Sequence, residues 1–214
     1  FSFQIDVQLM QMLTAILDVA AFLYALAFFP APFFWLLIHP AIEFWRRKGN
    51  RAYWVALPVW AGMGWALYLV RAPLFAHRLD RGALTWVLGC SVLALVAWLD
   101  RQVFREFSVR RLIGLPEFHP ERGGDEVVRA GIYAHLRHPR YLGYILTFFG
   151  LALLTGALGI FALAIVTVLM YVIVAPFEER ELRKRYGAAY DAYAREVPRF
   201  IPRLRGKLRA SVST

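Results

Sequence analysis

Long apolar blocks alternate with short polar segments along this sequence. Residues 52–70 and 82–99 contain no Asp, Glu, Lys, Arg or His, and residues 141–177 continue without any of them for 37 positions. A helix needs about 20 apolar residues to cross the hydrocarbon core of a bilayer. Each of the first two blocks therefore predicts one transmembrane helix, whereas the third is long enough for two.

The block 141–177 is predicted to fold as a helical hairpin. Thr155 and Gly156 lie near its middle and favour a turn there. Because a hairpin returns the chain to the side that it left, the residues before 141 and those after 177 should lie at the same membrane face.

The first apolar block, residues 7–42, is compatible with two folds. Its only acidic, basic or histidine residues are Asp18 and His39, and Pro30-Ala31-Pro32 interrupts it. One long span, tilted or kinked at the prolines, fits this pattern, and so does a full span followed by a short re-entrant piece. We favour one span, which gives about five spans in the whole chain.

The composition agrees with a membrane protein, since 59% of the residues are apolar and only 19% are charged. In lipid only helices and closed barrels satisfy the backbone, and these blocks lack the alternation of barrel strands. The predicted fold class is therefore all-α, a polytopic transmembrane helical protein rather than a soluble bundle. The single cysteine, Cys90, excludes a disulfide within the chain and is expected to pack rather than react.

The positive charges are concentrated on one predicted side of the membrane. The segments 46–51, 100–140 and 178–214 carry 22 of the 25 Lys and Arg residues, and residues 71–81 carry the other three. Positively charged loops stay in the cytoplasm, which predicts an outside N-terminus and a cytoplasmic C-terminus. A net charge of +10 placed there suits an anionic leaflet and membrane lipids, so we expect no nucleic-acid partner.

Three polar segments should gather on this cytoplasmic side. Residues 100–113 mix apolar side chains with arginines, as an amphipathic helix in the membrane interface does. Residues 114–131 are rich in Gly and Pro and predict a loop. Residues 178–197 predict one charged amphipathic helix that ends before Pro198.

The two ends of the predicted hairpin should form one polar pocket, because packed helix axes lie about 8–10 Å apart. Pro139 suits the first turn of the incoming helix with His138 as its cap, and Pro176 is predicted to kink or break the outgoing helix. The pocket would offer cations, carboxylates and phenols. These are Arg137, Arg140 and His138, then Glu178 and Glu179, then Tyr133, Tyr141 and Tyr144.

A cation beside a carboxylate can hold a zwitterionic amino-acid group. The alternative is structural: the arginines would bind lipid phosphates and the glutamates would cap a helix. The sequence has no G-x-G-x-x-G after a strand and no H-E-x-x-H. His119, His135, His138 and Glu117 lack the spacing of metal ligands, so we predict no metal site.

Two motifs resemble a known family. GIYAHLRHPRYLGYIL at 131–146 and EERELRKRYGAAYDAYAREVPRFIP at 178–202 resemble the integral-membrane methyltransferases related to isoprenylcysteine carboxyl methyltransferase and to phospholipid methyltransferases. The likeness covers about residues 125–202. It implies S-adenosyl-L-methionine as the cofactor at the cytosolic face and a lipophilic or lipidated acceptor carrying a carboxylate, amine or thiol.

The resemblance also implies roles for single residues. Cofactor-binding positions would be Asp125, Glu126, Val127, Val128, Tyr133, His138, Pro139, Arg140 and Tyr141. Glu178 and Glu179 would be catalytic residues on the acceptor side, and Arg137, a cation that the predicted pocket itself offers, is our third catalytic candidate. The isoprenylcysteine enzymes carry an Arg about four residues before this Glu, where this chain has Val174, which argues against a prenylcysteine carboxylate acceptor.

These motifs divide the chain into N-terminal transmembrane helices over 1–99 and a catalytic part over 100–214. Membrane sterol and steroid reductases, which use NADPH, share a similar C-terminal pattern and are the alternative enzyme class. A small non-enzymatic membrane subunit is a further alternative, and cofactor binding would exclude it.

Overall fold

A computed structural model describes residues 2–106 and 126–202, with side chains from residue 8 onward. Residues 107–113 of the predicted interfacial helix, the predicted loop as far as Asp125, and the tail after residue 202 lie outside the described residues. All regular elements in the described part are helices, so the predicted all-α class is confirmed.

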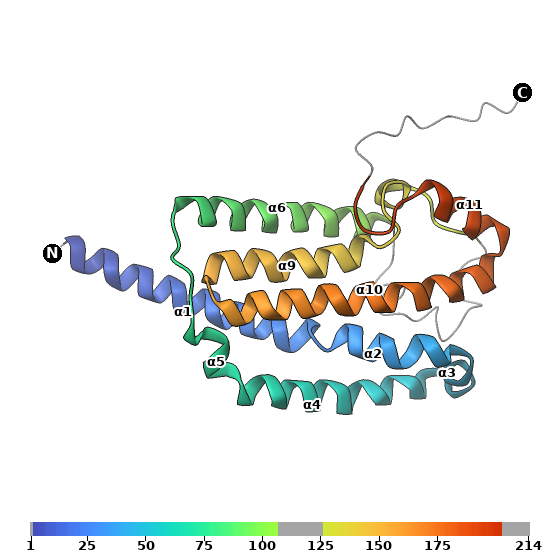
Figure 1. The fold of residues 1–214 in the computed structure, drawn as a ribbon, viewed down its shortest axis with the longest axis horizontal. Helices are drawn as coiled ribbons and strands as arrows, with labels where there is room; N and C mark the ends of the chain where they lie inside the picture. The colour runs from blue at the N-terminus through green and yellow to red at the C-terminus, as the bar shows by residue number, and fades with distance from the viewer. Residues whose placement is uncertain (1, 107–125, 203–214) are drawn as a thin grey trace, which may run out of the picture.

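The N-terminal half contains two antiparallel helical segments. The first contains α1 (Ser2–Phe28) and α2 (Ala31–Ile38), which are separated at Pro30 and continue in nearly one line, as the favoured kinked span predicts (Figure 1). Proline lacks the backbone N–H that would continue the helix. The remaining elements are η1 (His39–Ala41), α3 (Ile42–Lys48), η2 (Gly49–Val55), the returning α4 (Ala56–Leu69) and α5 (Arg71–Ala76).

The C-terminal half contributes three long helices. They are α6 (Ala83–Glu106), α9 (Pro139–Thr155) and α10 (Leu158–Tyr186), with the short η4 (Gly131–Ala134) before α9 and α11 (Ala188–Glu196) after α10. Helix α9 lies at the centre of the bundle and packs against α6, α10 and α1, while α10 also packs against α2. The buried α9 residues Phe148, Leu151 and Ala152 belong to the main hydrophobic core cluster.

The predicted hairpin is confirmed. Helix α9 ends at Thr155, and Gly156 follows with a φ of 68°, a left-handed conformation that glycine adopts most readily. The loop before α6 fastens this turn, because Arg78 donates hydrogen bonds to the Thr155 carbonyl and to the Asp18 carboxylate of α1. Asp18, the acidic residue of the first apolar block, is thereby paired with Arg78.

Three described segments are long and apolar enough to cross a membrane: Gln8–Leu69, Ala83–Glu106 and Leu158–Tyr186. The first contains both α1 and α4, and α9 has 17 residues. Large hydrophobic side chains such as Leu23, Trp65, Leu84 and Leu169 are exposed along the outside of the bundle. Such a surface suits lipid rather than water, and the chain is an integral membrane protein.

Three predicted helix boundaries are wrong. Residues 100–106 continue α6 instead of starting a separate helix. Helix α10 continues through Pro176, because the loss of one backbone hydrogen bond is tolerated inside a packed transmembrane bundle. The single helix predicted over 178–197 is instead the end of α10 and the separate α11, divided at Gly187, whose φ is 55°.

The polar segments collect at one end of the bundle. In Figure 1 this end is on the right, where α3, the end of α6, the start of α9, the end of α10 and α11 meet. The opposite end contains the α9–α10 turn and the loop before α6. Segments far apart in sequence thus surround the motif residues.

Candidate active site

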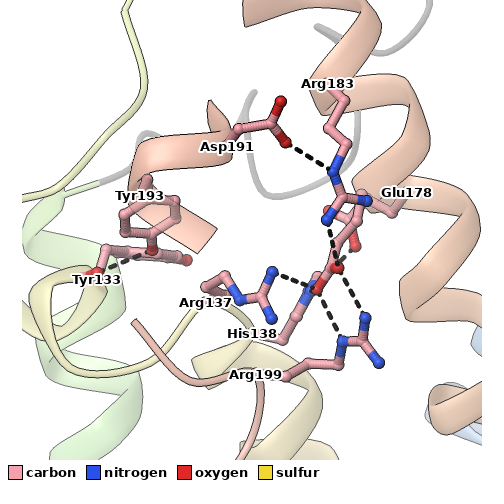
Figure 2. A network of polar contacts seen from close by, with 9 residues as sticks. Tyr133, Arg137, His138, Glu178, Arg183, Asp191, Tyr193 and Arg199 are labelled. Atoms are coloured by element: carbon pink, nitrogen blue, oxygen red, sulfur yellow. Dashed lines mark hydrogen bonds and ion pairs between the residues drawn. The ribbon is translucent and has the colours of Figure 1, made fainter. Parts of the chain in front are cut away.

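The two ends of the hairpin meet around His138, as predicted (Figure 2). His138 is the cap of α9, with Pro139 in the first turn, and its imidazole is buried. Its Nδ1 lies 3.3 Å from a Glu178 carboxylate oxygen, and its Nε2 lies 3.0 Å from a Glu179 carboxylate oxygen. Thus the R-H-P and E-E motifs, about 40 residues apart, form one cluster.

The backbone after α11 closes this cluster. The Arg137 and His138 amides donate hydrogen bonds to the Pro198 and Arg199 carbonyls. This pairing brings Arg199 onto Glu179, where its guanidinium donates two hydrogen bonds of 2.8 and 2.7 Å. Bidentate pairs of this kind are strong and directional. Arg199 was missed in the sequence because only the folded C-terminal segment brings it to the motif.

Glu179 is a fully buried carboxylate held by cations. Its side chain has no exposed surface, and besides Arg199 and His138 it has the Arg137 guanidinium at 3.1 Å. A buried charge is tolerated when it is paired in this way. Glu179 therefore holds together the segments that form the site.

Glu178 has a different environment. Its side chain is 22% exposed, and one of its oxygens accepts a 2.7 Å hydrogen bond from the Tyr141 hydroxyl. The Tyr141 ring stacks on the His138 imidazole with an interplanar angle of 6°. Glu178 is thus the more accessible of the two motif carboxylates.

Arg137 is paired with Glu179, but the described protein does not satisfy all of its donors. Its side chain is 11% exposed, its Nη1 lies 3.1 Å from a Glu179 oxygen as an ion pair, and its buried Nε makes no hydrogen bond to any described residue. The nearby Tyr190 hydroxyl is also buried without a hydrogen-bond partner in the described part. Buried unsatisfied donors are unfavourable unless a ligand or water satisfies them. A bound carboxylate would do so.

The opposite wall of the site is aromatic and neutral. The Tyr193 hydroxyl donates a 2.8 Å hydrogen bond to the Tyr133 carbonyl, and Val127 packs against the buried Tyr190–Tyr193 cluster. Burial raises the pKa of the Tyr133 phenol and of the Tyr193 phenol, so both remain protonated donors. Glu126 is exposed and Val128 is half-buried on the same segment.

His138 is expected to carry a proton. Burial alone would lower the pKa of its imidazole, but the Glu178 and Glu179 carboxylates outweigh that effect and raise the pKa above its ordinary value. A protonated His138 then bridges two carboxylates. By contrast, Arg140 turns to the Tyr144 hydroxyl, to which it donates a 2.9 Å hydrogen bond, and not to either glutamate.

A second polar cluster on α10 was not predicted. His39 Nδ1 lies 3.1 Å from a Glu181 carboxylate oxygen, and Arg46 pairs with the other oxygen. Both His39 and Glu181 line a cleft of about 390 Å³ between α10 and the η1–α3 segment. The sequence signal was present, since His39 is the only histidine in the first apolar block and Glu181 follows Glu178 by three residues.

Comparisons with known proteins point to one family. Residues 84–189 match the family described as phospholipid methyltransferase. Methanethiol S-methyltransferase 2 of Bradyrhizobium diazoefficiens is 40% identical over 155 residues, which cover 70% of this chain and 52% of that protein. Methanethiol S-methyltransferase of Mycobacterium tuberculosis is 30% identical over 149 residues, which cover 67% of this chain and 56% of that protein.

A third relative is named for methylating isoprenylcysteine. Protein-S-isoprenylcysteine O-methyltransferase B of Arabidopsis thaliana is 31% identical over 78 residues, covering 36% of this chain and 40% of that protein. The chain spans about half the length of the methanethiol S-methyltransferases that it matches. No solved structure matches the chain significantly.

Proposed function

We propose that this chain is a member of the phospholipid methyltransferase family, which its residues 84–189 match, and that it transfers a methyl group from S-adenosyl-L-methionine to a lipophilic acceptor. The observation that carries this proposal is the buried Arg137 Nε–H, which has no hydrogen-bond partner in the described part, beside the cluster of His138, Glu178 and Glu179. The cofactor site would occupy the end of the bundle where η4, α9, α10 and α11 meet.

The side chains present suit this cofactor. Its methionine portion is a zwitterion. Arg137, through its unpaired Nε–H, would bind the carboxylate while a motif carboxylate pairs with the ammonium. Tyr133, His138, Pro139, Arg140 and Tyr141 would line the cofactor site, with Glu126, Val127 and Val128 contributing through the backbone. When bound, the cofactor supplies a methyl group on a positively charged sulfur.

The protein's own residues would position rather than react. Tyr141 and His138 both contact Oε2 of the Glu178 carboxylate, which positions this oxygen before an acceptor arrives. Alignment of acceptor, methyl group and sulfur in one line supplies much of the rate in such transfers. We assign Glu178 to the acceptor side and Glu179 to holding the site together, because Glu179 is fully buried among cations.

The site would face the cytoplasm and the acceptor would come from the membrane. The end of the bundle that carries the cluster contains the arginine-rich segments, and positively charged segments remain cytoplasmic. A water-soluble donor and a membrane-dissolved acceptor could then reach one site from two phases.

Among possible acceptors we favour a small thiol. Two relatives are named for methylating methanethiol, at 40% and 30% identity. The residue four positions before Glu178 is Val174, a fully buried apolar side chain that cannot bind a prenylcysteine carboxylate.

Calorimetry with S-adenosylhomocysteine, the product form of the cofactor, tests this proposal. The purified wild-type protein should bind it, and Arg137→Ala should weaken binding by about tenfold or more, because charged hydrogen bonds contribute about 1.5–3 kcal/mol. Tyr133→Ala should weaken it too, whereas Arg195→Ala, on the exposed face of α11, is the matched control and should not. Binding of NADPH without binding of S-adenosylhomocysteine would favour the reductase alternative.

A further inference from the structure

Arg140 is a cation that the cluster around His138 does not use. Its guanidinium donates one hydrogen bond, of 2.9 Å, to the Tyr144 hydroxyl one turn further along α9, and it forms no ion pair with a described residue. The side chain is half-buried, so part of the guanidinium stays accessible. Because arginine has five N–H donors, most donors of Arg140 lack a partner within the described part of the chain.

A second donor without a partner lies on α10 beside Tyr144. Tyr171 is fully buried, and its hydroxyl makes no hydrogen bond to any described residue. Its ring is nearly parallel to two rings of α9, that of Tyr141 at a centroid distance of 4.2 Å and that of Tyr144 at 6.0 Å. A buried hydroxyl is normally satisfied by protein, water or a ligand. Three phenols thus join α9 to α10 and leave one hydroxyl free to bind a ligand.

Arg140 is also close to the carboxylate that we assign to the acceptor side. The charges of Arg140 and Glu178 both act on the Tyr133 phenol, which therefore lies near each of them. Tyr141, which donates its hydrogen bond to Glu178, follows Arg140 directly in α9. Acceptor and methyl donor must meet in line during transfer, so a residue at the edge of the cofactor site can contact the acceptor as well.

We propose that Arg140 and the Tyr171 hydroxyl bind the sulfur of a small thiol acceptor in its thiolate form, an inference that rests on the methyl transfer proposed above. The thiol S–H bond breaks before the transfer, and its proton passes to water. The thiolate sulfur then forms a bond to the methyl carbon as the bond between that carbon and the cofactor sulfur breaks. The products are a thioether, S-adenosylhomocysteine and the released proton.

The charges around Arg140 leave its own charge available for an anion. Of the two carboxylates nearby, Glu178 is held by Tyr141 and His138. The other, Asp100, is exposed and forms no ion pair with Arg140 in the described structure. A neighbouring cation lowers the pKa of a thiol, so the acceptor would ionise at this position without a dedicated base. The titratable groups around Arg140 are Tyr141 and Tyr144 on α9, Tyr133 on η4, Tyr171 and Glu178 on α10, Asp100 on α6 and Tyr24 on α1.

The first experiment separates acceptor binding from cofactor binding. Arg140→Gln removes the charge but can still donate to Tyr144. With S-adenosylmethionine as donor, its kcat/KM for propanethiol should fall by about 10–10²-fold, and its Kd for S-adenosylhomocysteine should change by about threefold at most. Arg140→Lys keeps the charge and should recover most of the activity. Arg101→Gln, at an exposed position of α6, is the matched control and should leave both quantities unchanged.

The dependence of kcat on pH tests the ionisation of the bound thiol. A group that titrates in the enzyme–substrate complex appears in this profile. Removal of the Arg140 charge should move the rising limb for propanethiol to higher pH by about one unit or more, because a nearby cation favours the anionic form. Arg140→Lys should leave the limb near its wild-type position. A purely structural loss would lower the rate without moving the limb.

Tyr171→Phe keeps the stacked ring and removes only the hydroxyl. It should raise KM for propanethiol by about threefold to tenfold, the contribution of one hydrogen bond. It should not lower Tm, because that hydroxyl has no partner in the described part of the protein.

Several outcomes would overturn the inference. One is a loss of S-adenosylhomocysteine affinity in Arg140→Gln as large as its loss of activity, which would assign the side chain to the cofactor. Unchanged propanethiol kinetics in Arg140→Gln or in Tyr171→Phe, or a pH limb that does not move, would also overturn it. A wild-type protein that binds S-adenosylhomocysteine but does not methylate propanethiol would overturn it while leaving the proposed cofactor intact. Absence of both binding and transfer would instead refute the proposed function itself.

Discussion

At the residue scale, Glu178 and Glu179 follow each other in the sequence but have different partners. Glu179 is buried among Arg199, Arg137 and His138, while Glu178 keeps part of its surface and accepts a hydrogen bond from Tyr141. The convergence of the two motifs could be predicted, because a hairpin must return to its starting side. The different roles of Glu178 and Glu179 could not be predicted, because they depend on Arg199, which the segment after α11 brings into contact with Glu179.

Replacing Glu179 should mainly affect stability. Glu179→Gln removes a buried negative charge and leaves its cations without a partner, a change that costs about 3–5 kcal/mol in buried ion pairs. Thermal unfolding in detergent should show a clear decrease in Tm. Glu178→Gln is the matched variant and should lower Tm less, because the glutamine oxygen can still accept from Tyr141. Equal Tm values for both variants would contradict the assignment.

The raised pKa of His138 predicts a dependence of stability on pH. The imidazole faces Glu178 and Glu179 from α10, Tyr141 from α9 and the segment with Arg199 and Phe200. Because the folded state binds this proton more tightly, the resulting stabilisation is complete below the ordinary pKa of about 6.5 and is lost as pH rises through the higher folded-state pKa.

The measurement is the difference in Tm between the wild-type protein and His138→Gln, recorded from about pH 6 to pH 9. We expect this difference to shrink as the pH rises. A constant difference across that range would show that His138 does not change its charge on unfolding, and a growing difference would show that its pKa is lowered.

At the element scale, the hairpin is determined by block length and by the turn residue. The span of 37 residues without charge requires two helices, and Gly156 provides the left-handed turn between them. The boundaries at Pro176 and Gly187 were wrong because local rules do not include tertiary support. A buried helix tolerates its proline, and the charge pattern continues across a glycine whose φ of 55° ends α10.

Substitution at the hairpin turn should destabilise the bundle. In Gly156→Ala the side chain would have to adopt a φ of 68°, and its Cβ would lie 2.7 Å from the Leu79 carbonyl oxygen. The expected loss of stability is about 1–3 kcal/mol, visible as a lower Tm. Gly62→Ala is the control, because open space surrounds that position inside α4, and its Tm should stay equal or rise slightly. A Gly156→Ala protein as stable as wild type would contradict this account of the turn.

At the scale of the whole molecule, the two ends of the bundle differ in charge and in content. The end with α11 contains both polar clusters, and the other end contains the turn that Arg78 and Asp18 fasten to α1. The lengths of the apolar blocks and the distribution of arginine predicted this division. The cleft at His39 could not be predicted, because it forms only where the η1–α3 segment packs against α10.

The charge asymmetry predicts the orientation in the membrane. In a Cys90→Ala background, Asp80→Cys should be labelled only from outside the cell, and Lys184→Cys only from the cytoplasm. Both positions are exposed, so access to reagent depends on the side of the membrane. Labelling of both positions from one side would contradict the predicted topology.

The most direct test of the central claim is the transfer of a labelled methyl group. The purified protein is incubated with S-adenosylmethionine carrying a radiolabelled methyl group and either propanethiol or a membrane lipid extract, and label is measured in the apolar fraction. We predict transfer by the wild-type protein and a loss of about 10²-fold in Glu178→Gln, the cost of a misaligned acceptor, with a smaller decrease in Tm than in Glu179→Gln. Absence of transfer to every acceptor, together with oxidation of NADPH by the same preparation, would contradict the account.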